Sequence, residues 1–406
     1  MNVIFLTMSR LTSISNRGIY TDLMRKFRRE GHDVYIVTPR ERSFGESTRM
    51  IEVDGVHILG VKTLNLQKTN IIEKGIGQVL VEGQYKRAIK KHLNGVVFDL
   101  IIYSTPPITF TKVIKFLKKR NPRASTYLLL KDIFPQNAVD IGMISKTGIK
   151  SILYKYFRNK ESKLYAISDN IGCMSPANVE YILKHNPIVD AHHIEVAPNS
   201  IELLETKFEE GQVRAERCYI RKKYNLPDDK PIFIYGGNLG KPQGIDFLIQ
   251  CLEVNKHRSD CFFVIVGNGT EFQKLNNWKR SNGECNLKIM QRLPKEDYDM
   301  LVRHCDVGLI FLDHRFTIPN YPSRLLSYLE YKMPVLCATD TNTDMGRIAE
   351  ENGFGYWCES NSVESFTSIL GKMIHSDRHK MGENGYEFLK KNYLVDNTYN
   401  AIISHV

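Results

Sequence analysis

The segment 231–244, PIFIYGGNLGKPQG, indicates the fold of this chain. Pro231–Tyr235 has the length and composition of a buried strand, and it runs directly into a glycine-rich loop. The apolar spacing of Ile245–Leu252, just after the loop, predicts a helix. Such a loop lets backbone N–H groups approach a phosphate, but a simple tight turn needs the same residues. The loop matches neither a Walker sequence nor a GxGxxG fingerprint.

The succession of strand, loop and helix recurs along the whole chain, which predicts parallel, doubly wound α/β sheets. We therefore expect two Rossmann-like domains facing a cleft, at residues 1–200 and 201–385, with 386–406 forming a helix that packs back towards the first domain. The charged segment Ser200–Lys223 is expected to hold the linker. Further strands are expected at Val3–Leu6, Asp33–Thr38, Leu100–Tyr103, Tyr127–Leu130, Ile167–Met174, Ile194–Val196, Phe262–Val266, Leu287–Met290, Val307–Phe311, Val335–Ala338 and Gly355–Cys358, and further helices at Gly18–Glu30 and Thr111–Lys119.

Composition narrows the class of protein. Hydrophobic residues make up 42% of the 406 residues, which is ordinary for a folded chain, and no run has the ~20 apolar residues of a membrane span. Met1–Met8 lacks the features of a secretory signal. Eight scattered cysteines without a CxxC pair argue against disulfides and a structural zinc site, and they suit a cytoplasmic location.

The net charge of +11 is carried by one half of the chain. Residues 1–199 hold 30 Lys and Arg against 17 Asp and Glu, a balance of +13, whereas residues 200–406 hold 26 against 28, a balance of −2. The first half is therefore expected to meet an anionic partner. Nucleic acid is one candidate, but no RNP, helix-turn-helix or zinc pattern supports it.

Candidate polar residues in the second half follow the predicted strands, at the sheet edge where open α/β folds bind ligands. Lys241 lies in the first loop, and Ser323-Arg324 opens a predicted helix that offers free N–H groups and a guanidinium to a diphosphate. A capped core helix with a surface arginine is the alternative. The other candidates are Gly237, Gly240, Gly267, Asn268 and Arg292.

The ordered series GGNLGKPQGIDFLI, VGNGTEF, QRLPKEDYDMLVRHCDVGLIFL and PSRLLSYLEYKMPVLCATD resembles the donor domain of retaining glycosyltransferase family 4, which has the GT-B fold. In the first half, NRGIYTDLMRKFRREGHDVYIVTP, KDIFPQNAVDIGM and IEVAPNSIE are similar to the acceptor-domain motifs of that family. The chain most resembles bacterial capsule and O-antigen transferases that add N-acetyl-L-fucosamine or a similar amino sugar. The resemblance implies that Arg17 and Gly18 contact the donor phosphates.

The sequence departs from the family pattern at polar positions. The two glutamates common in the family correspond to Pro319 and Ser327, so Glu330 is a candidate replacement ligand for the ribose or a solvent-facing residue. Asn238 and Gln243 stand where arginine and lysine are common. By resemblance, the positive charge for a diphosphate then comes from Lys241, Arg324 and Arg17.

Candidate acceptor residues lie in the first half. Lys131 and Asp132 follow a strand, and Asp132 is either a base or ligand for an acceptor hydroxyl or a turn-capping residue. Ser104 and Thr105 are candidates for lining the same pocket. His192-His193 is expected to be solvated rather than to bind metal, because adjacent strand residues point to opposite faces.

Ile149–Lys163 has one apolar stripe at helical spacing, surrounded by lysines. This pattern is typical of a membrane-surface helix, and also of a helix that packs on the core with a basic solvated face. The charge of the first half favours the membrane.

The resemblance implies transfer of a sugar, with retained configuration and without metal or other cofactor, from a UDP-sugar to a polyprenyl-diphosphate-linked saccharide. We expect the protein on the inner face of the plasma membrane, and we expect no nucleic-acid partner. The alternatives are a GT-B nucleotide-sugar epimerase and a basic nucleic-acid-binding protein. A dehydrogenase is disfavoured because the loop after Val3–Leu6 lacks GxGxxG.

Overall fold

In the computed structural model the chain forms two compact units, and the description covers residues 1–65, 71–149, 151–204 and 210–406. The N-terminal unit consists of Met1–Glu202 together with Tyr393–Val406, and the C-terminal unit is Leu203–Asn392. The chain thus returns to the first unit at Tyr393, not at residue 386 as expected. α14 (Arg378–Asn392) belongs to the C-terminal unit, and α15 (Val395–Ile403) belongs to the N-terminal one.

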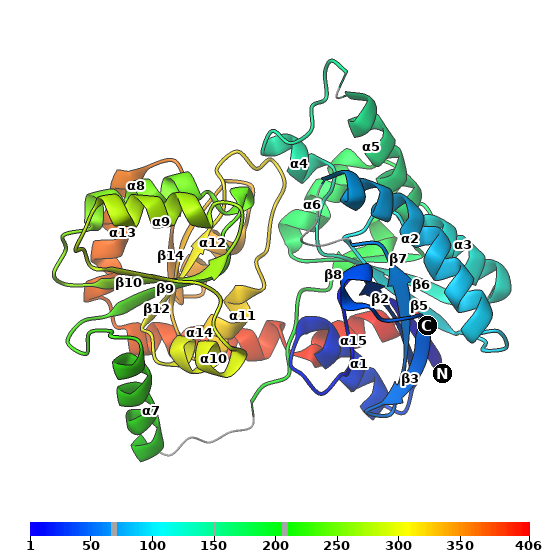
Figure 1. Ribbon diagram of the computed structural model, residues 1–406, viewed down its shortest axis with the longest axis horizontal. Coiled ribbons are helices and arrows are strands. Elements are labelled where there is room, and N and C mark those ends of the chain that lie inside the picture. Colours follow the sequence, from blue (N-terminus) through cyan, green and yellow to red (C-terminus); the bar gives the residue numbers. More distant parts are fainter. Residues whose placement is uncertain (66–70, 150, 205–209) are drawn as a thin grey trace. The chain divides into compact units, whose positions relative to one another are not determined.

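The N-terminal unit is built on an eight-stranded sheet in the order β3-β4-β2-β1-β5-β6-β7-β8 (Figure 1). All neighbours pair in parallel except β3, which is antiparallel to β4. The strands are β1 (Asn2–Leu6), β2 (Asp33–Glu41), β3 (Arg49–Val53), β4 (Val56–Thr63), β5 (Leu100–Ser104), β6 (Ser125–Leu130), β7 (Asn170–Cys173) and β8 (Ile194–Val196).

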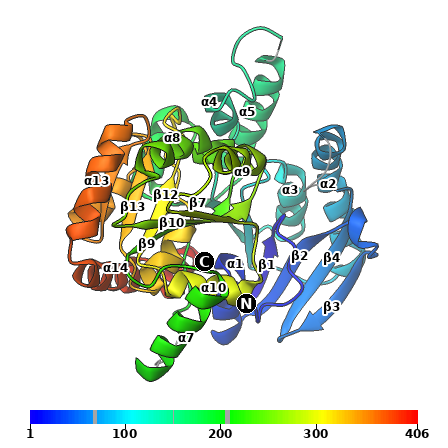
Figure 2. The same ribbon diagram turned by 60° about the vertical axis from the view of Figure 1, so that its left-hand side comes forward.

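Helices cover both faces of this sheet, which is why its central strands are apolar throughout. Val3 and Phe5 of β1 pack into one core with α1 and α15, while α2 packs on β4 and α3, as Figure 2 shows. The helices are α1 (Ile19–Arg29), α2 (Ile71–His92), α3 (Thr111–Arg120), α4 (Gln136–Asp140), α5 (Ser151–Tyr165) and α6 (Pro176–His185), with short 3₁₀ turns η1 (Arg42–Phe44) and η2 (Ala191–His193).

The C-terminal unit has a fully parallel six-stranded sheet in the order β11-β10-β9-β12-β13-β14. Its strands are β9 (Ile232–Asn238), β10 (Phe262–Asn268), β11 (Leu287–Met290), β12 (Val307–Phe311), β13 (Val335–Thr339) and β14 (Gly355–Glu359). Beside α14, its helices are α7 (Glu210–Lys223), η3 (Lys241–Gln243), α8 (Ile245–Asn255), α9 (Phe272–Ser281), α10 (Lys295–Arg303), α11 (Arg324–Glu330), α12 (Met345–Glu351) and α13 (Val363–His375).

The segment Ser200–Lys223, expected to hold the linker, also contains a packed helix. Arg221 of α7 is 1% exposed, and its guanidinium donates to the carboxylate of Asp306 at 2.9 Å and to the carbonyl of Pro227 at 2.6 Å. These bonds fix α7 onto the C-terminal unit. The charged composition of 200–223 did not predict this packing, because a buried, hydrogen-bonded arginine cannot be told from a solvated one in the sequence.

Candidate functional site

The carboxyl edge of the second sheet is made of closely packed glycines. A Cβ built on Gly267, near the end of β10, would lie 1.8 Å from the carbonyl oxygen of Gly237 on β9. A Cβ on Gly269 would lie 2.2 Å from the carbonyl oxygen of Leu239. Gly237 also has a φ of +140°, which disfavours any side chain. The strand ends therefore present bare backbone at the edge where α/β sheets bind ligands.

Arg324, the first residue of α11, lies beside this glycine edge. Its guanidinium carbon is 4.3 Å from the centre of the Tyr235 ring, and its Nη2 would be 3.1 Å from a Cβ on Gly237. Its Nη1 is buried and has no hydrogen-bond partner in the described part of the chain. Arginine stays protonated, and a buried charge is costly unless it is paired. The arrangement suits an anionic ligand that supplies the missing acceptor.

Two further tyrosines hold this arrangement in place. The Tyr328 hydroxyl accepts from the backbone N–H of Gly236 at 3.3 Å and lies 3.2 Å from the carbonyl of Ile234. The Tyr298 hydroxyl fills the space that a side chain on Gly236 would need. Burial raises the pKa of Tyr298 to about 12, so its ring stays neutral and does not neutralise the arginine.

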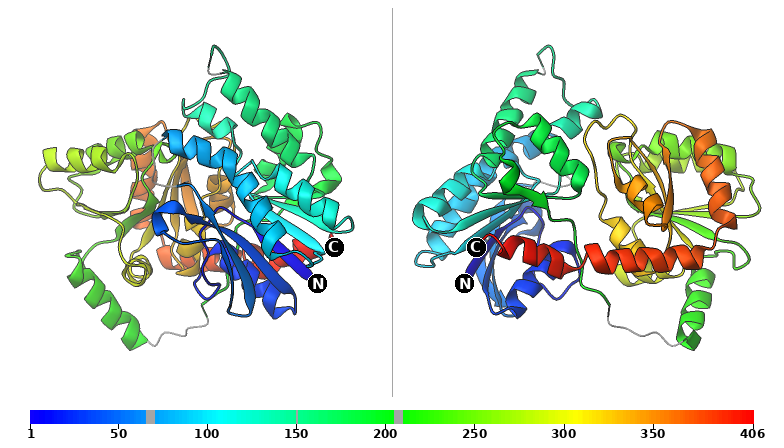
Figure 3. Two further views of the ribbon diagram at one scale, coloured as in Figure 1. Left: turned by 45° about the vertical axis from the view of Figure 1, so that its right-hand side comes forward. Right: turned by 180° about the vertical axis from the view of Figure 1, so that it is seen from behind.

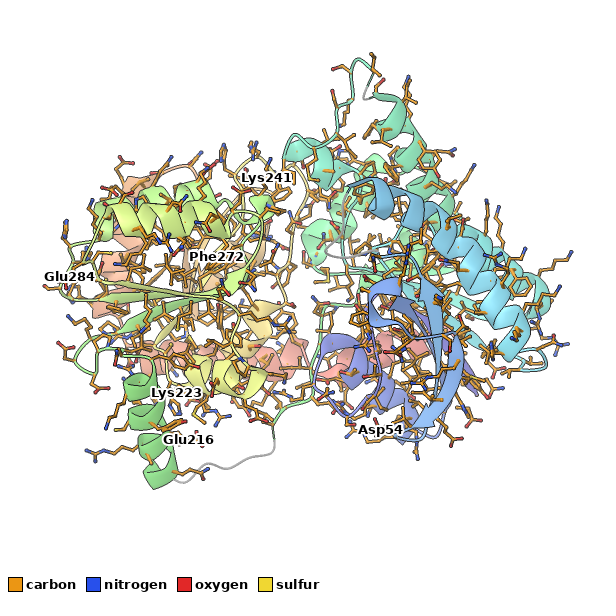
Figure 4. The ribbon with its side chains drawn as sticks, in the orientation of Figure 1. Asp54, Glu216, Lys223, Lys241, Phe272 and Glu284 are labelled. Carbon is orange, nitrogen blue, oxygen red and sulfur yellow. The ribbon has the colours of Figure 1, made fainter. Side chains whose placement is uncertain are left out.

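The loop after β9 is closed by its own side chains. The Gln243 amide oxygen accepts from Asn238 Nδ2 at 3.1 Å and from the backbone N–H of Gly240 at 3.2 Å. Gly240 precedes only the 3₁₀ turn η3, and α8 begins after Gly244, whose left-handed backbone interrupts the helix. Gly240 therefore does not begin an α-helix, and α8 begins at Ile245, as its apolar spacing predicted. Lys241 is exposed on this loop (Figure 4), and Asn268 and Arg292 are exposed on neighbouring strand ends.

The start of α11 also differs from expectation. Ser323 has a helical backbone and its side chain makes no capping hydrogen bond, so it is a first-turn residue and not a side-chain cap. Ser327 is exposed on this helix. Glu330, considered as a ribose ligand, accepts from the backbone N–H of Leu204 at 3.1 Å. One of its carboxylate oxygens therefore already accepts a hydrogen bond from the chain segment that enters the C-terminal unit.

In the N-terminal unit, Arg17 and Gly18 are tied into a local network. The Arg17 guanidinium donates to the Glu202 carbonyl at 2.6 Å, and the N–H of Gly18 donates to Asp22 Oδ1 at 3.0 Å. Asp22 is fully buried and also pairs with Arg25 at 2.5 Å. The polar groups expected to face a donor are thus engaged within the N-terminal unit.

Asp132 lies directly after β6 and lines a pocket of about 70 Å³. The Asn137 amide donates to both of its carboxylate oxygens, at 2.7 and 2.9 Å. Burial raises the pKa of Asp132 to about 6, although these bonds oppose the shift. The rest of the lining comes from residues 105–109 with Phe134 and Phe157, and the Thr109 hydroxyl there has no partner in the described residues. A carboxyl with this pKa in a small pocket can accept a proton from a hydroxyl near neutral pH.

The other three acceptor candidates shape the backbone around Asp132. The Thr105 hydroxyl accepts from the backbone N–H of Lys131 at 2.9 Å and of Asp132 at 3.1 Å. Lys131 Nζ donates to the Ala197 carbonyl at 3.0 Å, and burial lowers the pKa of Lys131 to about 7. Ser104, at the end of β5, is 1% exposed. Thr105 and Lys131 are placed to position Asp132, and Ser104 lies in the core.

Sequence reasoning missed Asn137, Tyr235 and Tyr298. Asn137 lies five residues after Asp132, and its position on the first turn of α4 was the only available signal. Tyr235 and Tyr298 come from different elements, so no local pattern joins them to Arg324. The described residues contain no group of three His, Cys, Asp or Glu side chains that could hold a metal ion, and none of the described helices is long and apolar enough to cross a membrane.

Two doubly wound sheets in separate units, parallel except at the edge strand β3 and each with polar residues at its carboxyl edge, define the GT-B class of fold. Residues 217–388, the part that carries the glycine edge and Arg324, match the family model "Glycosyl transferases group 1". The C-terminal unit is therefore similar to group 1 glycosyl transferase domains, and the fold of the chain is of the GT-B class.

Individual proteins extend this similarity. The chain is 24% identical to the "Probable glycosyltransferase WbjE" of Pseudomonas aeruginosa, over 66% of this chain and 64% of that protein. It is 23% identical to the "Putative colanic acid biosynthesis glycosyl transferase WcaI" of Escherichia coli K12, over 69% and 67%. The solved structure of Anabaena HepE in complex with UDP-glucose superposes with a TM-score of 0.69 at 13% identity, covering 100% of this chain and 98% of that one.

Proposed function

We propose that this chain is a retaining glycosyltransferase that moves a sugar from a UDP-sugar to a lipid-diphosphate-linked saccharide. The observation that carries the proposal is the unpartnered, buried Nη1 of Arg324 beside the bare glycine edge, within the segment that matches the family model. A guanidinium next to exposed backbone is a suitable receptor for a diphosphate.

The diphosphate is the leaving group in this reaction, and negative charge grows on it as the sugar–phosphate bond breaks. Arg324 stabilises that charge without reorganising, because Tyr235 and Tyr328 pack around it. Lys241 adds a second cation from the exposed loop. The sugar is attacked on the face that the diphosphate leaves, so the leaving oxygen takes the proton of the acceptor and neither a protein nucleophile nor a metal is required.

The acceptor side is proposed to be the pocket around Asp132. Asp132, with its pKa raised to about 6, accepts a hydrogen bond from the acceptor hydroxyl and orients it, while the proton itself goes to the leaving oxygen. The exposed apolar residues of α5, next to Phe157 of this pocket, are proposed to hold the protein on the inner face of the plasma membrane. The name of WcaI supports a role in polysaccharide synthesis, the UDP-glucose bound to HepE supports a UDP-linked donor, and the family resemblance supports an amino sugar such as N-acetyl-L-fucosamine.

Calorimetric titration with UDP tests the donor site. Arg324→Ala should weaken UDP binding by about 10- to 100-fold, since a hydrogen bond to a charged group contributes ~1.5–3 kcal/mol. It should lower kcat by about 10²- to 10³-fold, as loss of one preorganised donor does. Arg324→Lys, which keeps the charge without the planar fork, should recover part of both.

The control is Arg280→Ala, which removes an exposed arginine from α9 of the same unit and should leave both values unchanged. Unchanged UDP affinity and turnover in folded Arg324→Ala would remove Arg324 from the site. Conversion of a UDP-sugar without any acceptor would instead favour the epimerase.

A further inference from the structure

A second anion-binding site lies in the N-terminal unit. A pocket of about 420 Å³ opens between the end of β4, the turn η1 and the last turns of α2. Eleven described residues line it and none of them is acidic. We call it the basic pocket, after its five basic side chains: Arg42, Lys62, Arg87, Lys91 and His92.

Three separate elements bring these side chains together. Arg87 and Ala88 each lie three or four residues from both Gln84 and Lys91, so the four residues share one face of α2. That helix packs on β4 (Figure 2). The last residues of β4 also line the pocket. Arg42 adds a cation from η1. The pocket is therefore built by the fold and does not depend on one mobile side chain.

The described lining of the basic pocket contains no acid, although Glu41 lies opposite Thr63 in the ladder of β2 and β4. None of its four Lys and Arg side chains forms an ion pair with a described residue. Glu46, the acid closest in sequence to Arg42 on its C-terminal side, is held by Arg10 at 2.7 Å and by Arg40 at 3.0 Å. Surface lysines and arginines ordinarily lie among acids of the opposite sign, so a concave surface with one sign of charge concentrates anions.

Two buried polar atoms in the lining also lack partners. Thr63 is 2% exposed, and its hydroxyl makes no hydrogen bond to any described residue. The amide oxygen of Gln84 is buried and equally unpartnered among the described residues. Such groups are costly unless something satisfies them. They provide a buried amide oxygen and a buried hydroxyl in a lining whose lysines and arginines are exposed.

We propose that the basic pocket binds a phosphorylated polyol or sugar: the cations take the phosphate, and Thr63 and Gln84 bind the hydroxyl groups of the ligand. The volume is within the range of about 300–1,000 Å³ that small-molecule sites occupy. Its lining lies wholly in the N-terminal unit, whereas Arg324 lies in the C-terminal one, so this site is additional to the proposed donor site. The phosphate belongs either to a free metabolite or to a lipid headgroup.

Titration with inorganic pyrophosphate and with glycerol 3-phosphate tests the proposal. The double variant Arg87→Glu/Lys91→Glu should weaken binding of both probes at least tenfold, while UDP binding stays unchanged. The matched control Lys115→Glu/Lys119→Glu makes the same charge change on exposed positions of α3 and should bind as the wild type does. If charge reversal prevents folding, Arg87→Gln/Lys91→Gln replaces it.

Thr63→Val separates recognition from simple charge attraction. It should weaken glycerol 3-phosphate binding and leave pyrophosphate binding unchanged. A parallel sedimentation with phosphatidylcholine vesicles, with and without phosphatidic acid, identifies the source of the phosphate: loss in the pocket variant alone assigns a headgroup. Equal losses in the α3 control, or unchanged binding of all probes by the pocket variant, would overturn the proposal. An effect confined to Arg324→Ala would also overturn it, because the probes would then occupy the donor site only.

Discussion

Asp132 is a carboxylate whose surroundings favour its neutral form. Its two oxygens accept from the same Asn137 amide nitrogen, and no described cation pairs with it. Lys131, its neighbour, directs its ammonium to the Ala197 carbonyl instead. Burial therefore dominates, and the pKa of Asp132 rises to about 6 from its ordinary value of 3.8. Asp132 can therefore exchange a proton near neutral pH, but its ionised form lowers the free energy of unfolding.

Asp132→Asn is expected to stabilise the protein at pH 8 and to lower turnover. A carboxyl whose folded-state pKa is raised contributes stability below its unfolded pKa near 4 and loses it as the pH rises through about 6. Asparagine removes this loss, by about 1–3 kcal/mol. Asn137 accommodates the change, because its amide oxygen is buried without a partner among the described residues and can accept from the new amide. Urea unfolding at pH 8 and at pH 4 measures the difference, which should shrink at the lower pH.

Asp169→Asn is the matched control with the opposite sign. Its carboxylate accepts from Lys118 at 2.8 Å and from the Thr126 N–H at 2.9 Å, and its pKa is lowered although burial opposes the shift. This variant should therefore be less stable than the wild type at pH 8. If Asp132→Asn also lowers the free energy of unfolding at pH 8, the ionised Asp132 does not destabilise the folded protein. Burial would then not raise the pKa of Asp132 as described.

At the scale of single elements, α5 shows what a sequence pattern leaves open. Its spacing predicted an apolar stripe but not what covers that stripe. In the structure Ile152 is 71% exposed and Leu153 is 48% exposed, and Ile149 just before the helix is 90% exposed. A helix that packed on the core would bury these residues. Because lysines such as Lys155 flank them, the helix has the features of an interfacial membrane element.

The double variant Ile152→Ser/Lys155→Glu should release the protein from anionic vesicles, with no change in thermal unfolding because both side chains are exposed. Vesicle sedimentation measures the effect, which should also diminish at high salt. Val97→Ser/Lys119→Glu, an equivalent change at exposed positions outside α5, is the control. Unaltered sedimentation of the α5 variant would show that this helix does not contact membranes.

Lys150 lies outside the described residues and is not substituted. Arg158 is unsuitable for charge reversal because it donates to Glu161 at 2.6 Å and to Asn186.

The central strands of both sheets were predictable because both of their faces are buried, which makes them continuous apolar runs. β3, β4 and α2 were not predicted. β3 is an edge strand with partly exposed side chains, and α2 contains Gly75, Gly77 and Gly83, which obscure a helical pattern. Of these elements, β4 and α2 carry most of the lining of the basic pocket, so the pocket was not predictable from the sequence. Arg324 was predicted as a residue, but its tyrosine surroundings depend on tertiary contacts.

At the scale of the whole molecule, the chain crosses between its units twice. α15 completes the core of the N-terminal unit almost 200 residues after the chain has left it, and Figure 3 shows it against α1. Ile402 is fully buried in that core, and the Tyr399 ring packs on Phe27 with 4.9 Å between ring centres. The N-terminal unit is therefore incomplete until the C-terminus has been added, and its stability depends on residues that belong to no acceptor motif.

Ile402→Ala should lower the stability of the N-terminal unit by about 2–5 kcal/mol, as the loss of a fully buried aliphatic side chain does. Hydrogen exchange measured by mass spectrometry should then accelerate in β1, β2 and α1, although these elements lie more than 350 residues away in sequence. Leu370→Ala, which opens a similar cavity in the core of the C-terminal unit, should instead accelerate exchange in β9 and β12. Equal acceleration in both units by either variant would show that the two units unfold together, because a cavity in one core would then destabilise a sheet that it does not touch.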